Sequence, residues 1–219
     1  MKPDYDKAAI MAIETLSKYS ISATPVSPLS ILKKIPGVLV VSYQSVADNV
    51  AEDRSRVINK FGSHNVDAFT SVNIHNGKPQ YLVTYNQMLS YVLTQRALAR
   101  QLGHIVLGHD GSLPDEVRQE EARCFAHHLL CPRPMIHSVM ATGIRFTVEV
   151  HGSLTGYYDT CLASMRRLPP THVPADLNRH VRERFLPYVK NFFEYERTAS
   201  LSDGSALADF GTYMEGYEE

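Results

Sequence analysis

The spacing of apolar residues along the 219-residue chain predicts a mainly helical protein with a few strands in its first half. Apolar side chains that recur every three or four positions predict helices, and β-branched runs bounded by turn residues predict strands. Asn76-Gly77, between two such runs, is typical of a tight hairpin turn because both residues tolerate positive φ. The predicted helices cover 4–19, 29–35, 88–107, 114–130, 134–140, two segments within 144–168, and 176–197, and the predicted strands cover 38–41, 68–75 and 80–85.

Pro79 stands immediately before the second strand of the predicted hairpin. A proline has no backbone N–H and therefore cannot donate to a hydrogen-bond ladder in the middle of a sheet. Residues 80–85 are accordingly predicted to form an edge strand.

Composition and charge are those of an ordinary globular protein. With 44% hydrophobic and 21% charged residues the chain can form a packed core, and a formal net charge of -1 argues against a nucleic-acid protein held by bulk electrostatics. No apolar run reaches the roughly 20 residues that cross a bilayer, and acidic residues interrupt the N-terminal segment, unlike in a signal peptide. Cys124, Cys131 and Cys161 form no CxxC pair, which suits free thiols in a reducing compartment. We expect a soluble, cytoplasmic protein.

Residues 98–132 carry the most specific pattern in the chain. LARQLGHIVLGH spans 98–109, and EEARCFAHHLLCP spans 120–132. In order and spacing the two segments resemble the ImmA/IrrE family of zincin-like metallopeptidases, whose members read LAHELGHxxLGH and then EAxxFAxxLLxP.

The resemblance implies an α+β fold with a zincin-like metallopeptidase core. A small, mainly antiparallel sheet is expected beside a helix pair, followed by C-terminal helices. The expected metallopeptidase domain covers residues 1–170, a helical extension covers 171–198, and an acidic, flexible tail covers 199–219.

Zinc chemistry in this family depends on residues that the chain only partly retains. Two histidines four residues apart share one face of a helix and can bind one zinc ion. The resemblance implies that the glutamate beside the first histidine is the general base, and that a glutamate on the next helix is the third ligand. Here His104 and Glu121 occupy the second and third ligand positions, but Arg100 replaces the first histidine and Gln101 replaces the catalytic glutamate.

These two replacements predict the loss of the zinc site and of catalysis. Gln101 cannot accept a proton at neutral pH, and Arg100 has no lone pair for a metal. His104 and Glu121 are two protein ligands, whereas a catalytic zinc needs three. We therefore expect neither a metal nor another cofactor. We also expect the Arg100 guanidinium to reach Glu121 and to supply the charge that zinc provides in the relatives.

A second interpretation keeps a metal through a rearranged ligand set. Glu121, Cys124 and His128 lie on one face of the predicted 114–130 helix, and with His104 they offer four mixed donors. An active zinc endopeptidase would use three of these donors, His104, Glu121 and either Cys124 or His128.

Three further histidines lie near this segment. His109 is expected to interact with the dipole of the helix that ends before it. His127 and His137 are expected on the surface.

The resemblance favours a catalytically inactive homologue that binds a protein or peptide partner, in a regulatory role linked to repressors or mobile elements. In zincins an edge strand holds an extended peptide by strand addition, so Tyr81, Val83 and Tyr85 are the candidate binding residues. A further alternative is a non-enzymatic scaffold that binds a partner through the aromatic residues within 185–195.

Overall fold

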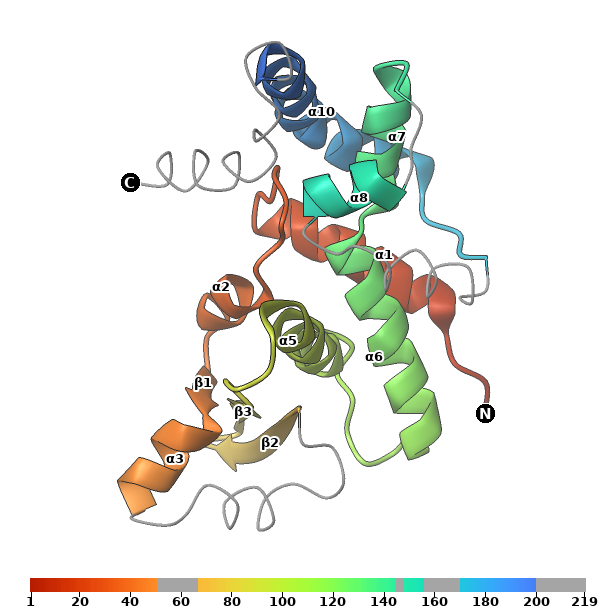
Figure 1. Cartoon of the computed structure of the whole chain (residues 1–219). Coiled ribbons are helices and arrows are strands. Elements are labelled where there is room, and N and C mark those ends of the chain that lie inside the picture. The colour runs from red at the N-terminus through yellow and green to blue at the C-terminus, as the bar shows by residue number, and fades with distance from the viewer. Residues whose placement is uncertain (51–66, 145–147, 156–169, 200–219) are drawn as a thin grey trace.

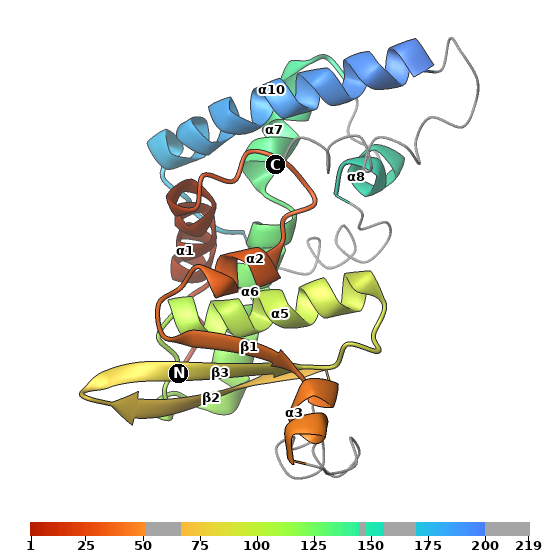
Figure 2. The same ribbon diagram turned by 90° about the vertical axis from the view of Figure 1, so that its left-hand side faces the viewer.

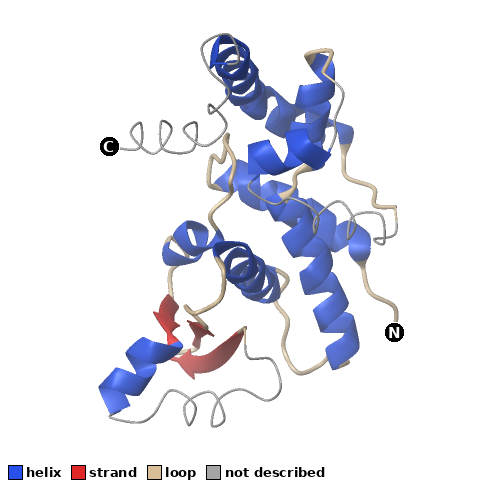
Figure 3. Ribbon diagram, viewed as in Figure 1, coloured by secondary structure: helices blue, strands red, loops and turns tan. Residues whose placement is uncertain are grey.

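The computed structural model describes residues 1–50, 67–144, 148–155 and 170–199, and in these ranges helices pack above a small sheet (Figures 1 and 3). The predicted α+β class is confirmed. The strands are β1 (Val38–Ser42), β2 (Ala68–His75) and β3 (Lys78–Tyr85), and the helices are α1 (Tyr5–Lys18), α2 (Pro28–Lys33), α3 (Tyr43–Val50), α5 (Tyr91–Val106), α6 (Asp115–Leu130), α7 (Arg133–Ala141), α8 (Val148–Thr155) and α10 (Ala175–Ala199).

Side-chain caps set where several of these helices begin. The Asp4 carboxylate accepts a hydrogen bond from the backbone N–H of Lys7 at the start of α1, and the Ser90 hydroxyl accepts one from Leu93 at the start of α5. Such caps satisfy donors that the first helical turn leaves free. The prediction that the α5 helix begins at residue 88 is therefore a little early, because Asn86 accepts from the Met88 N–H in a turn before the cap.

The sheet is mixed, with the order β1-β3-β2. β1 runs parallel to β3, and β2 runs antiparallel to it through the predicted hairpin. Helix α5 lies across one face of the sheet, and α3 lies on the other side near the end of β1 (Figure 2).

The prediction of an edge strand at 80–85 is wrong, because β3 is the central strand. The Tyr81 N–H donates to the Gly37 carbonyl at 2.8 Å. The backbone groups of every second residue of β3 therefore point toward β1, and Pro79 is one of these residues. The pairing with β1 begins at Val38 and Tyr81. Pro79 thus lies beyond the paired part of β1, where no donor is required of it.

Helices α5 and α6 approach closely at Gly103. A methyl group at this position would lie 3.1 Å from Cδ1 of Phe125 and 3.3 Å from Cα of Ala122, both on α6. Phe125 and Ala122 are fully buried, so neither has open space to move into. A glycine here lets the two helices bring His104 and Glu121 to the same region.

The aromatic residues of α10 pack into the body of the protein. Phe185 is fully buried and Phe192 nearly so, against α7 and α1, and the Tyr188 hydroxyl donates to the Thr24 carbonyl at 2.7 Å. These side chains belong to the same hydrophobic core as those of α5 and α6. Most of the aromatic face that would serve a scaffold function is therefore occupied within the chain, and Phe193 and Tyr195 are partly buried.

Some predictions fall outside the described residues, including everything expected of Cys161 and of 200–219. The domain limits near residues 170 and 198 stay a prediction. Within the described ranges, no helix is both long enough and apolar enough to cross a membrane.

Candidate functional site

Gln101 is buried between α5 and the edge of the sheet, with 7% of the residue exposed. Its side-chain N–H donates to the Ala68 carbonyl at 3.2 Å, and its Oε1 accepts from the Thr70 hydroxyl at 2.9 Å. Because a backbone carbonyl can only accept, these partners fix which end of the amide carries the nitrogen. Gln101 therefore ties α5 to β2.

Arg100 pairs with the sheet side of the site and not with Glu121. Its Nη2 lies 3.4 Å from Oδ2 of Asp67, the residue before β2, and both side chains are about one-third exposed. The expected ion pair between Arg100 and Glu121 is thus wrong, since each residue has another partner nearby. Burial is the main cause that lowers the pKa of Arg100, and the charge of Asp67 opposes it.

The Glu121 carboxylate is buried and has a partner on each oxygen. Oε2 accepts from Nε2 of His109 at 2.9 Å, and Oε1 accepts from the backbone N–H of Asp4 at 2.7 Å. Asp4 caps α1, so the start of this helix also contributes to the site. A buried carboxylate is stable only when it is hydrogen-bonded in this way.

His109 links Glu121 to His104. Nδ1 of His104 lies 2.9 Å from Nδ1 of His109, so one proton is shared between the two facing nitrogens. Burial, followed by the charges of His109 and Arg118, lowers the pKa of His104 to about 4. The interpretation of His109 as a residue that only interacts with the helix dipole is wrong. Its place in the LGHxxLGH motif was the signal that could have assigned it to the site.

The residues at this site do not fit a catalytic zinc ion, which the family resemblance implies. Three donors must converge on one point, but the His109 ring uses one nitrogen toward His104 and the opposite nitrogen toward Glu121. These donors therefore point at each other. Arg100 cannot serve as a ligand, and among the described residues no three His, Cys, Asp or Glu side chains are arranged to hold a metal.

The rearranged ligand set is not assembled either. The Cys124 thiol lies 3.6 Å from the Tyr5 carbonyl, and burial raises its pKa to about 12, whereas zinc binds a thiolate. Nε2 of His128 lies 3.3 Å from the Thr171 hydroxyl. Cys124 and His128 thus have partners away from His104.

The two remaining histidines differ from each other. His127 is buried, with 7% of the residue exposed, so the prediction of a surface position is wrong for it. The Phe125-to-Leu130 part of α6 packs inside the core, which leaves little room for a solvated ring. His137 is exposed, as predicted.

The sheet offers a free edge at β2 and not at β3. Tyr81, Val83 and Tyr85 are paired with β1 on one side and β2 on the other, so a peptide cannot add to the sheet along them. The Asn86 N–H donates to the Asp67 carbonyl at 2.8 Å. The backbone groups of Asp67 thus point toward the β3 side. Because this direction alternates along an antiparallel strand, the backbone groups of Ala68 and of every second residue after it point away from β3. These residues are Ala68, Thr70, Val72 and Ile74.

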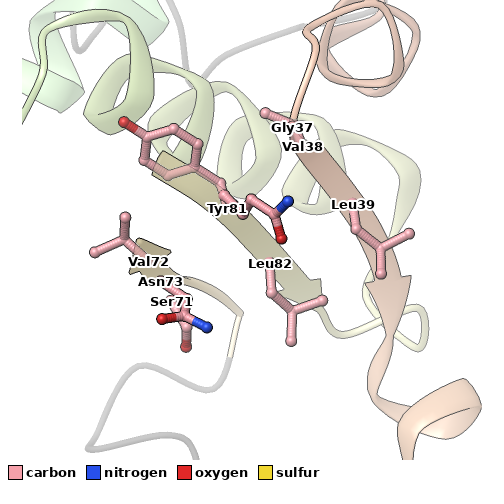
Figure 4. A pocket seen from close by; sticks show the side chains of 9 residues that line it. Gly37, Val38, Leu39, Ser71, Val72, Asn73, Tyr81 and Leu82 are labelled. Carbon is pink, nitrogen blue, oxygen red and sulfur yellow. The ribbon is translucent and has the colours of Figure 1, made fainter. Parts of the chain in front are cut away.

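A shallow groove of about 500 Å³ lies on the sheet face opposite α5 (Figure 4). Leu39 and Leu82 project into this region, whereas Tyr81 projects toward α5. The groove is thus separated from Gln101 and Glu121 by the sheet itself.

Comparison with known proteins gives one match. The family model described as the IrrE N-terminal-like domain, Peptidase_M78, matches residues 56–158. This range contains β2, β3, α5 and α6, and with them Arg100, Gln101, His104 and Glu121. No curated protein and no solved structure matches the chain.

Proposed function

We propose that the chain, whose residues 56–158 match the IrrE N-terminal-like family model, binds an extended polypeptide without cleaving it. The state of Gln101 carries the first half of this proposal. At the position of the family's catalytic glutamate stands an amide whose nitrogen and oxygen are both bonded to β2. Loss of a general base typically removes about 10²–10⁴-fold of rate, and here the replacing side chain is also held in place.

The free edge of β2 carries the second half. Within the described chain this edge pairs with no other strand, and Gln101 occupies only its first carbonyl, that of Ala68. Thr70, Val72 and Ile74 continue the edge, and the last two are 59% and 65% exposed. An extended peptide that adds to such an edge gains main-chain hydrogen bonds and contacts for alternate side chains.

Binding without cleavage suits a regulatory role, because a captured segment is withheld from other partners. The link to repressors or mobile elements that the resemblance implies belongs to this proposal. The alternative of a zinc endopeptidase lacks a converging donor set in the described geometry. The alternative of a scaffold is less favoured, because three of the aromatic side chains that it requires on α10, those of Phe185, Tyr188 and Phe192, are already buried.

Replacing Val72 with proline tests strand addition. The Val72 N–H faces the free edge, so proline removes a donor to the peptide but none to the β3 ladder. We expect Val72→Pro to weaken binding of a fluorescein-labelled peptide of three Val-Gln repeats by about tenfold, measured by fluorescence anisotropy. Val72→Ala keeps the N–H and should bind within a small factor of the parent protein.

Ser71 is the control position for this test, because its backbone N–H points in the opposite direction to that of Val72. Its N–H faces β3, so Ser71→Pro is expected to lower thermal stability, whereas Val72→Pro should not. If Val72→Pro folds normally and binds the peptide as well as the parent protein, strand addition at β2 is refuted.

A further inference from the structure

Three arginines lie together where α5 packs against α6. Arg96 and Arg100 are four residues apart and so share one face of α5. Arg123 lies on α6, which makes more contact with α5 than any other helix does. The three residues are here called the arginine cluster.

The nearby carboxylates do not form an ion pair with every arginine of this cluster. Arg100 is paired with Asp67 at 3.4 Å, which is long for a charge-assisted hydrogen bond. Arg123 is paired with Glu120 on its own helix. No carboxylate of the described residues lies within ion-pair distance of Arg96, although Arg96 is half-buried.

The α5–α6 contact lies beside these arginines: a methyl group at Gly103, three residues after Arg100, would lie 3.3 Å from Cα of Ala122, which directly precedes Arg123. Burial is the largest cause that lowers the pKa of Arg100, the charge of Asp67 opposes it, and the charges of Arg96 and Arg123 make smaller contributions that lower it further. His127 follows Arg123 by one helical turn on α6; burial is the largest cause that lowers its pKa to about 4, and the charges of Arg96, Arg123 and Arg100 add to this effect. Nδ1 of His127 is buried and has no hydrogen-bond partner among the described residues.

Like charges on two half-buried arginines, Arg96 and Arg100, with the exposed Arg123 on the next helix and no matching carboxylate for Arg96 in the described part of the chain, are costly in the free protein. An anion that binds there would offset this cost. Guanidinium groups match carboxylates in two-point geometry, and Asp67 shows that a carboxylate can reach Arg100. Since Asp67 directly precedes Ala68, the cluster stands at the beginning of the β2 edge.

We infer that the arginine cluster of Arg96, Arg100 and Arg123 binds the acidic side chains of the polypeptide that adds to β2. This inference rests on the proposed function and names the chemistry of its partner. The acidic residues belong at the end of the peptide that lies beside Ala68. A nucleic acid is the less suitable occupant, because the chain has a formal net charge of -1.

The test compares two labelled peptides on the full chain by fluorescence anisotropy. One has three Val-Glu repeats, and the other has three Val-Gln repeats. We expect the glutamate peptide to bind at least about tenfold more tightly at low ionic strength, and the preference to shrink as salt is added.

The variants locate this preference. Arg96→Gln loses no ion pair and should fold normally, so it is expected to reduce the preference alone. The triple replacement of Arg96, Arg100 and Arg123 by glutamine should abolish it. The matched control is the double variant Arg179→Gln and Arg182→Gln, which removes two exposed charges from α10 and should leave the preference unchanged.

The outcomes separate the two proposals. Equal binding of both peptides, with loss of both in Val72→Pro, keeps strand addition and overturns the arginine inference. A glutamate preference that Arg96→Gln removes but Val72→Pro leaves intact keeps the arginine site and overturns strand addition. Absence of peptide binding, or tighter binding of a labelled oligothymidylate that depends on the same arginines, overturns the inference of an acidic peptide.

Discussion

Lowering the pH from 7 to 5 is expected to reduce the free energy of unfolding by several kcal/mol. Burial is the main cause that holds the pKa values of His104, His127 and His128 at about 4 in the folded protein. An unfolded histidine has a pKa near ~6.5.

The sign follows from which state binds the proton. Between pH 6.5 and pH 4 the unfolded chain takes up protons that the folded protein excludes. Stability is therefore complete above this window and is lost as the pH falls through it. At pH 5 each of the three histidines contributes a loss of about 2 kcal/mol.

Urea unfolding at a series of pH values measures this loss. His127→Leu should reduce the pH dependence by about one-third, because it removes one of three similar groups. It should also not destabilise the protein at pH 7, since the Nδ1 atom of His127 has no hydrogen-bond partner in the part of the chain that the structure describes. His137→Gln is the matched control, because His137 is exposed. An unfolding free energy that stays constant from pH 7 to pH 5 would contradict the buried, neutral state of these rings.

Restoring the family's glutamate by Gln101→Glu is expected to destabilise the protein by about 2–3 kcal/mol at pH 7. The side-chain N–H that now donates to the Ala68 carbonyl would become a carboxylate oxygen at the same 3.2 Å. Two acceptors would then face each other in a buried site. In the relatives the corresponding glutamate acts as a base, whereas here the position has become part of the α5–sheet contact.

The pH dependence of this variant distinguishes charge repulsion from simple loss of a contact. A buried carboxyl that faces an acceptor has a raised pKa, and in its protonated form it can donate to the Ala68 carbonyl. The difference in stability between Gln101→Glu and the parent protein, compared at equal pH, should therefore narrow as the pH falls. Gln101→Met, which loses the contacts without adding charge, should show a constant difference. Equal stability of Gln101→Glu and the parent protein at pH 7 would show that Gln101 is not held as described.

Local pattern is enough to predict most of the described helices and the hairpin, because spacing, caps and the Asn76-Gly77 turn act over a few residues, but it does not predict α3. Local pattern does not predict strand order, because strand order depends on which elements are neighbours in space. Pro79 correctly lacks a ladder partner, but only the register of β1 against β3 shows that none is needed at that position. The two edge strands are therefore β1 and β2, and the pattern could not distinguish β2 from β3 within the hairpin.

The same limit applies to the site. The motif correctly places Arg100, Gln101, His104 and Glu121 on two packed helices. It does not contain Asp4, which lies 117 positions before Glu121 and caps one of its oxygens. The Asp4 N–H and the His109 ring together provide a hydrogen-bond partner for each oxygen of the Glu121 carboxylate. An ion pair with Arg100 is therefore not required. The charge that zinc would carry is thus not replaced by a guanidinium, and hydrogen bonds satisfy the carboxylate instead.

The most direct test is the zinc content of the full chain purified without chelator, measured by mass spectrometry of the metal together with hydrolysis of an unfolded polypeptide. Because His104, His109 and Glu121 bond to one another and Arg100 cannot bind a metal, we predict substoichiometric zinc and no hydrolysis that EDTA abolishes. One zinc per chain, with cleavage that EDTA removes and zinc restores, would contradict this account.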